Sequence, residues 1–76
     1  MAERKVVDAR GSFCPGPLME LIAAIKMVEV GDEIEVLSSD KGSASEIPQW
    51  LKKVGHEHLG TVEEAGTWHV ALRRAK

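Results

Sequence analysis

The segment Glu33-Ile34-Glu35-Val36 alternates acidic and apolar residues with a period of two. This pattern is typical of a β-strand that turns one face to water and the other to a hydrophobic core. A sheet covered by helices on both faces needs strands that are almost continuously apolar. The alternation therefore predicts that the helices of this chain cover only one face of its sheet, in two layers.

Before this segment, the sequence predicts a short strand and then a helix. Lys5-Val6-Val7-Asp8 is the strand, and Gly11 and Ser12 end it. The helix begins at Pro15 and ends near Gly31, since glycine is common just past a helix C-terminus. A right-handed crossover of this kind makes the strands on either side of it parallel. The apolar residues on the buried face of the helix have the spacing i, i+3, i+4, i+7 and i+10: Leu18, Leu21, Ile22, Ile25 and Val28.

A second helix is predicted after the segment. Ser43 and Glu46 have the spacing of a capping box, while Pro48 suits only a first helical turn and so favours Ser45 as an alternative N-cap. Gly55 is expected to be the C-cap of this helix. The apolar face of the helix comprises Ile47, Trp50, Leu51 and Val54.

Two more strands complete the pattern, at residues 58–64 and 67–73, joined by a turn at Ala65-Gly66. The resulting order of elements is β-α-β-α-β-β. We therefore expect an α+β fold, a two-layer α/β sandwich in which a mixed four-stranded sheet carries two helices on one face. With a length of 76 residues, the chain has room for a single domain over residues 1–76.

Composition and charge narrow the classes of function. A formal net charge of −2 argues against direct nucleic-acid binding, which normally requires a clear excess of cations. The longest apolar run, Leu21 to Ile25, is far shorter than the roughly 20 residues that cross a bilayer. The N-terminal residues contain no apolar signal core. The single cysteine excludes an intramolecular disulfide and fits a reducing compartment, so we expect a cytoplasmic protein with no membrane attachment.

The segment Cys14-Pro15-Gly16-Pro17 places the only thiol of the chain at the expected start of the first helix. The positive end of a helix stabilises an anion and lowers the pKa of a cysteine there. Because the two prolines have no N–H, the Gly16 amide is expected to point at the sulfur. A lone cysteine is also commonly a buried apolar residue, so the spacing alone favours a reactive Cys14 and a structural one about equally.

The residues around this thiol resemble the TusA (SirA-like) family of sulfur-carrier proteins, whose signature is Cys-Pro-x-Pro at the start of the first helix. The resemblance extends over nearly the whole chain, and the fold of the family is a two-layer sandwich with the same β-α-β-α-β-β order. The matching segments are Asp8-Ala9-Arg10-Gly11, Cys14-Pro15-Gly16-Pro17-Leu18, Gly31-Asp32-Glu33-Ile34-Glu35-Val36, Ser39-Asp40, Glu46-Ile47-Pro48 and Gly55-His56-Glu57.

The resemblance implies that Cys14 carries sulfane sulfur as a persulfide, within the motif completed by Pro15, Gly16 and Pro17. The sulfur would come from a donor protein of the cysteine desulfurase, rhodanese or DsrE-like class and pass to an acceptor protein, with no cofactor. Because the chain has no second cysteine to resolve the persulfide, it is a relay component more than a self-contained enzyme. Thiolation of tRNA, molybdenum-cofactor sulfuration and oxidation of reduced sulfur compounds remain open as pathways, as does selenium as the cargo.

Four residues are candidate contacts for these partners, namely Phe13, Asp40, Glu46 and Trp50. Phe13 stands where many members of the family carry a basic residue. Because interface charges select partners, the lack of a basic residue here makes the tRNA-thiolation partners less expected. Phe13 either anchors a partner or packs beneath its own loop.

A metal site and a binding module are the other interpretations to consider. His56, His58 and His69 do not have the spacing of zinc ligands, so no metal is expected. The alternative function is a noncatalytic regulatory module that binds RNA or protein through the open face of its sheet. Glu33, Glu35 and His69 are expected on that face, and the acidic charge there opposes contact with phosphate.

Overall fold

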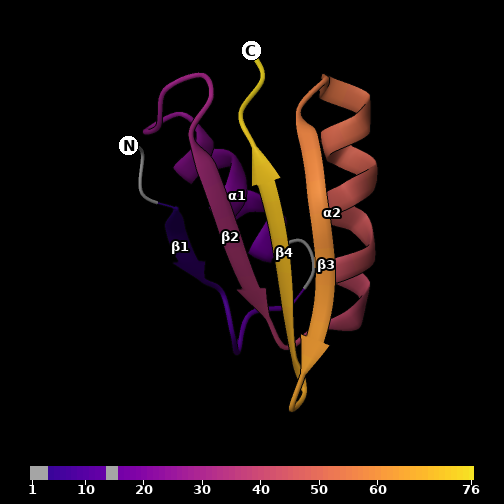
Figure 1. Ribbon diagram of the computed structural model, residues 1–76. Coiled ribbons are helices and arrows are strands. Elements are labelled where there is room, and N and C mark those ends of the chain that lie inside the picture. Colours follow the sequence, from indigo (N-terminus) through magenta and orange to yellow (C-terminus); the bar gives the residue numbers. More distant parts are fainter. Residues whose placement is uncertain (1–3, 14–15) are drawn as a thin grey trace.

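The computed structural model describes residues 4–13 and 16–76, and within these ranges it contains four strands and two helices in the predicted order. The sheet faces the viewer in Figure 1 and the helices lie behind it, on a single face, which confirms the two-layer arrangement. No helix within the described ranges is long and apolar enough to span a membrane. The elements are β1 (Lys5–Asp8), α1 (Gly16–Ile25), β2 (Glu33–Ser38), α2 (Lys41–Val54), β3 (Glu57–Glu64) and β4 (Thr67–Arg73).

The sheet has the strand order β1-β2-β4-β3, so β2 and β4 form its central pair. β1 is parallel to β2, whereas β2 and β3 are both antiparallel to β4, which confirms the predicted mixed sheet. The register of the central pair places Ile34 opposite Leu72 and Val36 opposite Val70. The apolar residues of both strands therefore point to the same face of the sheet, and the polar residues between them point to the other face.

The hydrophobic core lies between this apolar face of the sheet and the helices. Burial of one such side chain contributes on the order of 1.5–3 kcal/mol. Trp50 and Trp68 are partly buried and pack against the core, as their positions on apolar stripes predicted. The large apolar residues with no exposed surface are Leu21 of α1, Ile47 and Leu51 of α2, Ile34 and Val36 of β2, and Val70 and Leu72 of β4.

The first helix is shorter than predicted. α1 ends at Ile25, well before Gly31, and Val28 lies beyond the helix although it still packs against the core. A contact from the far end of the chain caps this end, because the Arg74 guanidinium donates hydrogen bonds to the carbonyl oxygens of Ile25, at 3.1 Å, and of Val28. These bonds satisfy carbonyl groups that have no partner within the helix, and they stabilise its end at this point.

The second helix begins earlier than predicted. α2 starts at Lys41 and its N-cap is Asp40, so the prediction of Ser43 or Ser45 as the cap is wrong. The Asp40 carboxylate accepts hydrogen bonds from the amides of Gly42 and Ser43, each at 3.3 Å, and from the Ser43 hydroxyl at 2.8 Å. A carboxylate at this position satisfies two helical amides at once, which favours the earlier start.

Pro48 consequently stands inside α2 and not in its first turn as predicted. It has no N–H to donate to the carbonyl oxygen of Ala44, one turn earlier, and proline in a helix interior costs about 3 kcal/mol. Gly55 ends the helix as predicted, with a left-handed φ of 91° and its amide bonded to the Leu51 carbonyl oxygen at 2.9 Å.

β3 and β4 form the predicted hairpin, which turns at Ala65 and Gly66. These residues have φ angles of 52° and 82°, and a two-residue turn of type I′ requires positive φ at both positions. The register shifts between His58 and Gly60, so that Leu59 is an extra residue in β3. A β-bulge of this kind changes which side chains share a face of the strand.

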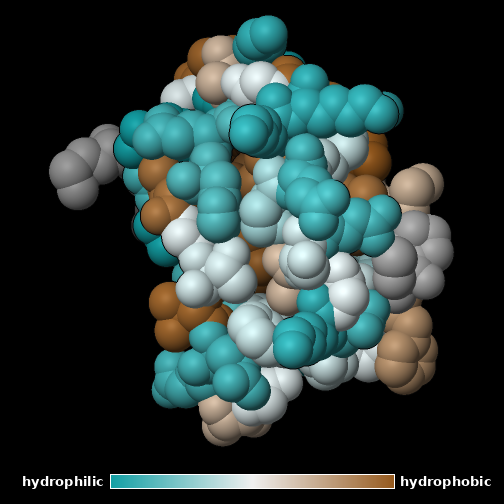
Figure 2. Space-filling model, turned by 90° about the vertical axis from the view of Figure 1, so that its right-hand side faces the viewer, coloured by the Kyte–Doolittle hydropathy of each residue, from teal (hydrophilic) through white to brown (hydrophobic). Residues whose placement is uncertain are grey.

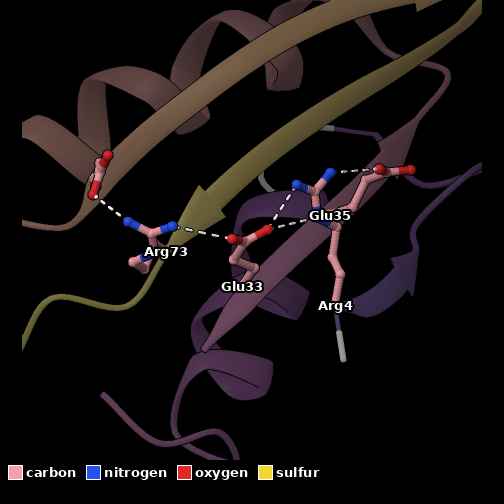
Figure 3. A network of polar contacts seen from close by, with 5 residues as sticks. Arg4, Glu33, Glu35 and Arg73 are labelled. Carbon is pink, nitrogen blue, oxygen red and sulfur yellow. Dashed lines mark hydrogen bonds and ion pairs between the residues drawn. The ribbon is translucent and has the colours of Figure 1, made fainter. Parts of the chain in front are cut away.

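Charged side chains cover the open face of the sheet in a continuous network, which Figure 3 shows. The Arg4 guanidinium contacts Glu33 at 2.7 Å and Glu35 at 3.3 Å, and Arg73 contacts Glu33 at 3.1 Å. The His69 Nδ1 atom lies 3.0 Å from the Glu35 carboxylate. The hydrogen bond from Arg4 lowers the pKa of Glu33, and the one from His69 lowers the pKa of Glu35. This face presents paired charges, which gives no support to binding of RNA phosphates there.

Replacement of Arg74 by alanine should remove both hydrogen bonds at the end of α1. We expect the free energy of unfolding to fall by about 1.5–3 kcal/mol, because a hydrogen bond from a charged donor contributes on this order. Urea unfolding followed by circular dichroism measures the change. Arg10→Ala is the matched control, since this guanidinium pairs with the exposed Asp8 carboxylate and its removal should leave the stability nearly unchanged. Equal losses in the two variants would contradict the capping role of Arg74.

Glu33 and Glu35 should make the fold sensitive to acid. Their pKa values in the folded chain are below the ordinary value of 4.5, so the folded state binds fewer protons than the unfolded state in this range. The stability they contribute is present above pH 4.5 and is lost as the pH falls through the lowered pKa values. Arg4→Gln should reduce this loss, as measured by urea midpoints at a series of pH values. If the urea midpoint of this variant depended on pH as that of the wild type does, the ion pairs of Arg4 would contribute nothing to the acid sensitivity of the fold.

Candidate functional site

The loop that leads from β1 into the cysteine motif is held by the end of β2. The Ala9 amide donates a hydrogen bond to the Leu37 carbonyl oxygen at 2.8 Å, and the Gly11 amide donates one to the Ser39 hydroxyl oxygen at 3.0 Å. In Figure 1 this loop lies at the same end of the sheet as the start of α2. The backbone therefore has a defined path up to residue 13, directly before the cysteine.

The motif itself is partly described. Cys14 and Pro15 lie outside the described residues, whereas Gly16 and Pro17 form the start of α1, within one residue of the predicted start at Pro15. The side chain of Pro17 is fully buried and so anchors the first turn of the helix. Proline suits this position because the amides of a first helical turn have no acceptor within the helix.

The Gly16 amide has a backbone partner. It donates a hydrogen bond to the Phe13 carbonyl oxygen at 2.6 Å. The prediction that this amide points at the thiol concerns Cys14, which lies outside the described residues. Glycine is also favoured here by space, since a Cβ at this position would lie 3.0 Å from the Cβ of Ser12, closer than an ordinary contact.

Exposed apolar side chains flank the motif on both sides. Phe13, directly before it, is 77% exposed, and Met19, in the first turn of α1, is 58% exposed. The interpretation that Phe13 packs beneath its loop is therefore wrong. Aromatic residues and methionine are enriched where proteins meet. Their presence beside the motif is consistent with a surface that a partner protein covers.

Glu46 and Trp50 lie on the side of α2 next to α1. With Leu18, Gln49 and Lys53 they line a shallow hollow of about 350 Å³. Leu18 directly follows the Cys-Pro-Gly-Pro motif in the sequence, so the hollow adjoins the helix that begins with the motif. The structure thus brings two of the four predicted partner contacts close to the start of α1.

Asp40 is at the end of the sheet that carries the motif loop, because the neighbouring Ser39 bonds to Gly11 of that loop. Its carboxylate caps α2, a structural role that the sequence analysis did not assign to it. The signal that could have revealed this role is an aspartate directly before the lysine and glycine that open a helix, since aspartate is among the preferred N-caps.

The histidines make separate contacts. His56 accepts a hydrogen bond at Nδ1 from the Ala75 amide at 3.1 Å, and His58 Nε2 lies 2.8 Å from the Thr61 hydroxyl oxygen. His69 is on the open face of the sheet, as predicted. In residues 4–13 and 16–76, no group of three His, Cys, Asp or Glu side chains is arranged to hold a metal ion.

Comparisons with known proteins agree with this geometry. The family model described as Sulfurtransferase TusA matches residues 5–74. A protein of Archaeoglobus fulgidus named "Putative sulfur carrier protein" is 55% identical over 71 residues, which cover 93% of this chain and 97% of that protein. Sulfur carrier protein TusA of Pseudomonas entomophila is 35% identical over 68 residues, which cover 90% of this chain and 85% of that protein.

A solved structure shows the same fold. The crystal structure of a SirA-like protein from Desulfitobacterium hafniense has a TM-score of 0.81 to this chain at 20% sequence identity, covering 93% of this chain and 97% of that one. The family match over residues 5–74 includes every strand and helix named above together with the Cys-Pro-Gly-Pro motif. The chain therefore belongs to the TusA sulfurtransferase family.

Proposed function

We propose that this protein is a sulfur carrier in which Cys14 holds sulfane sulfur as a persulfide. The observation that carries the proposal is the family match over residues 5–74, which spans the only cysteine of the chain within an intact Cys-Pro-x-Pro motif. The two relatives described above, both named as sulfur carriers, align over 93% and 90% of this chain. Because the chain has no other thiol, the proposal assigns both loading and delivery of sulfur to Cys14.

Loading follows the chemistry of thiol–disulfide exchange. The Cys14 thiolate attacks the outer sulfur of a persulfide on the donor protein. A new S–S bond forms at Cys14 while the S–S bond of the donor breaks, and the donor cysteine leaves as a thiolate. Delivery repeats the step with Cys14 as the leaving group, so neither step changes the total number of electrons or needs a cofactor.

The surroundings of the motif support this chemistry. The motif leads into the N-terminus of α1, and helix N-termini favour the thiolate form of a nearby cysteine. Hydrogen bonds to Leu37 and Ser39 hold the backbone of the loop that precedes the motif. The exposed Phe13 and the hollow beside Trp50 offer a partner two places to dock.

The partners that we propose are two proteins of the reducing cytoplasm. A cysteine desulfurase, rhodanese or DsrE-like protein supplies the sulfur, and a second protein with a nucleophilic acceptor receives it. The exposed Phe13 and the partly buried Trp50 contact these proteins, because aromatic side chains often contribute much of the binding energy at interfaces. Glu46 stands beside Trp50 and adds a negative charge that helps to select the partner.

Incubation with a persulfide donor should add sulfur to the wild-type protein but not to Cys14→Ser. Intact-protein mass spectrometry should show a gain of one or more sulfur atoms on the wild type, and a thiol reductant should remove it. The added sulfur is labile because a persulfide is itself open to thiolate attack. Equal loading of Cys14→Ser, or no loading of folded wild type by several donor types, would refute the sulfur-carrier proposal.

Replacement of Phe13 by alanine should slow the transfer of sulfur from a donor protein by about tenfold, as expected for loss of an aromatic anchor at an interface. Loading by inorganic polysulfide, which needs no docking, should stay at the wild-type rate. Val6→Ala is the matched control, since Val6 is also an exposed apolar residue, at 56%, but belongs to β1. Equal slowing of both sulfur sources would show that Phe13 acts on the thiol and not on docking.

A further inference from the structure

A groove runs between α2 and β3, on the side of α2 away from α1. It consists of two hollows of about 460 and 360 Å³, which meet at Pro48. Figure 2 views the molecule from this side and shows hydrophilic side chains around a paler strip with hydrophobic atoms deeper in the surface. The groove includes no residue of the Cys-Pro-Gly-Pro motif, so its binding properties do not depend on whether Cys14 carries sulfur.

The groove combines an apolar floor with a basic rim. Ala44, Pro48 and Trp68 supply apolar surface, while the exposed side chains of Lys41 and Lys52 line its two parts. Among the described residues that line the groove, none is acidic, although the whole chain has a formal net charge of −2. The lining of the groove therefore carries a positive charge, whereas the net charge of the whole chain is negative.

The bulge in β3 shapes the wall opposite α2. His58 and Thr61 are three residues apart, so in a regular strand their side chains would point to opposite faces. The extra residue Leu59 places them opposite Leu72 and Val70, on the face that the helices cover. The imidazole and the hydroxyl then meet at 2.8 Å and form a polar wall on the groove. Bulges are common beside binding sites because they redirect side chains in this way.

Two residues of the groove are unfavourable for the helix that carries them. Pro48 lies inside α2 and removes a helical hydrogen bond. Lys41 lies in the first turn of α2, where the positive end of the helix disfavours a cation. Residues that break local rules in this way concentrate at functional sites, where binding compensates for the cost to the fold.

Lysines supply the positive charge of the groove at neutral pH. Burial lowers the pKa of His56, and the charges of Arg74 and Lys76 lower it further, so this imidazole is neutral there. Lys41 and Lys52 are eleven residues apart in α2, which corresponds to about 16 Å along a helix. About five residues of extended polypeptide span the same distance.

We propose that this groove binds an extended acidic segment of a partner protein. Carboxylates of the segment pair with Lys41 and Lys52, and its apolar side chains rest on Pro48 and Trp68 between them. The apolar floor favours a polypeptide over an inorganic anion, because only a polypeptide presents both kinds of group along one strand. The groove shares only Gln49 with the hollow of Trp50 and contains no residue of the motif, so a partner can occupy it while the motif stays accessible.

The test uses the full chain and a short synthetic peptide in which glutamates alternate with leucines. Backbone amide shifts in NMR spectra should change saturably at residues 41–52 of α2 and 57–62 of β3. Binding should weaken as salt is raised, since exposed charge pairs are screened over about 10 Å at 0.1 M ionic strength. The same peptide with lysine in place of glutamate should cause no saturable change.

Matched variants distinguish peptide binding in the groove from binding elsewhere on the surface. Lys41→Glu combined with Lys52→Glu should raise the Kd of the acidic peptide by about tenfold or more, and the corresponding glutamine variants should give an intermediate increase. Lys26→Glu, which changes an exposed lysine outside the groove, should leave the Kd close to that of the wild type. Equal binding of the lysine peptide, or an unchanged Kd in the double variant, would overturn the proposal. Shifts of the groove residues that depend on protein concentration without peptide would also overturn it, because they would mean that a second copy of the chain occupies the groove.

Discussion

The pairing of β2 with β4 is the contact on which the rest of the structure depends. It places four fully buried side chains, Ile34, Val36, Val70 and Leu72, on one face, and α1 and α2 pack on them. β1 and β3 then attach at either side of this pair. A slip of one residue would turn Glu35 toward the core and Val36 toward water, so the register is strongly favoured. The same register creates the network of charges on the open face.

The end of β2 also organises the candidate site. The Leu37 carbonyl of β2 and the hydroxyl of Ser39, directly after β2, hold the loop before the cysteine motif, and the next residue, Asp40, caps α2. The motif and α2 are therefore both tied to one short piece of backbone. The loop before the motif and the N-terminus of α2 are thus held at the same end of the sheet.

The sequence was sufficient for the order of the elements and for their buried faces, because alternation and helical spacing report burial directly. It was insufficient where a distant or competing group decided the outcome. The early end of α1 is capped by Arg74, which is 49 positions away from Ile25, and no local feature of the sequence indicates such a contact. The start of α2 depends on burial of Ser43 against the fold, which favours Asp40 as the cap.

The motif was visible in the sequence, whereas parts of its setting were not. The hydrogen bond from the Gly16 amide to the Phe13 carbonyl depends on the path of the backbone. The exposure of the Phe13 side chain depends on which parts of the fold pack around it. Neither property follows from residue types or their spacing. The identity of the motif could therefore be predicted, while the way in which the fold presents it required the structure.

The bond from Arg74 to the end of α1 has a consequence for the order in which the chain matures on the ribosome. The helix that begins with the motif is made early, but the group that caps its end is made 49 residues after Ile25. The central strand partner, β4, also comes late in the sequence. Such long-range contacts delay folding until both ends of the contact exist. The helix that begins with the motif therefore acquires the cap at its C-terminal end only after residue 74 has been synthesised.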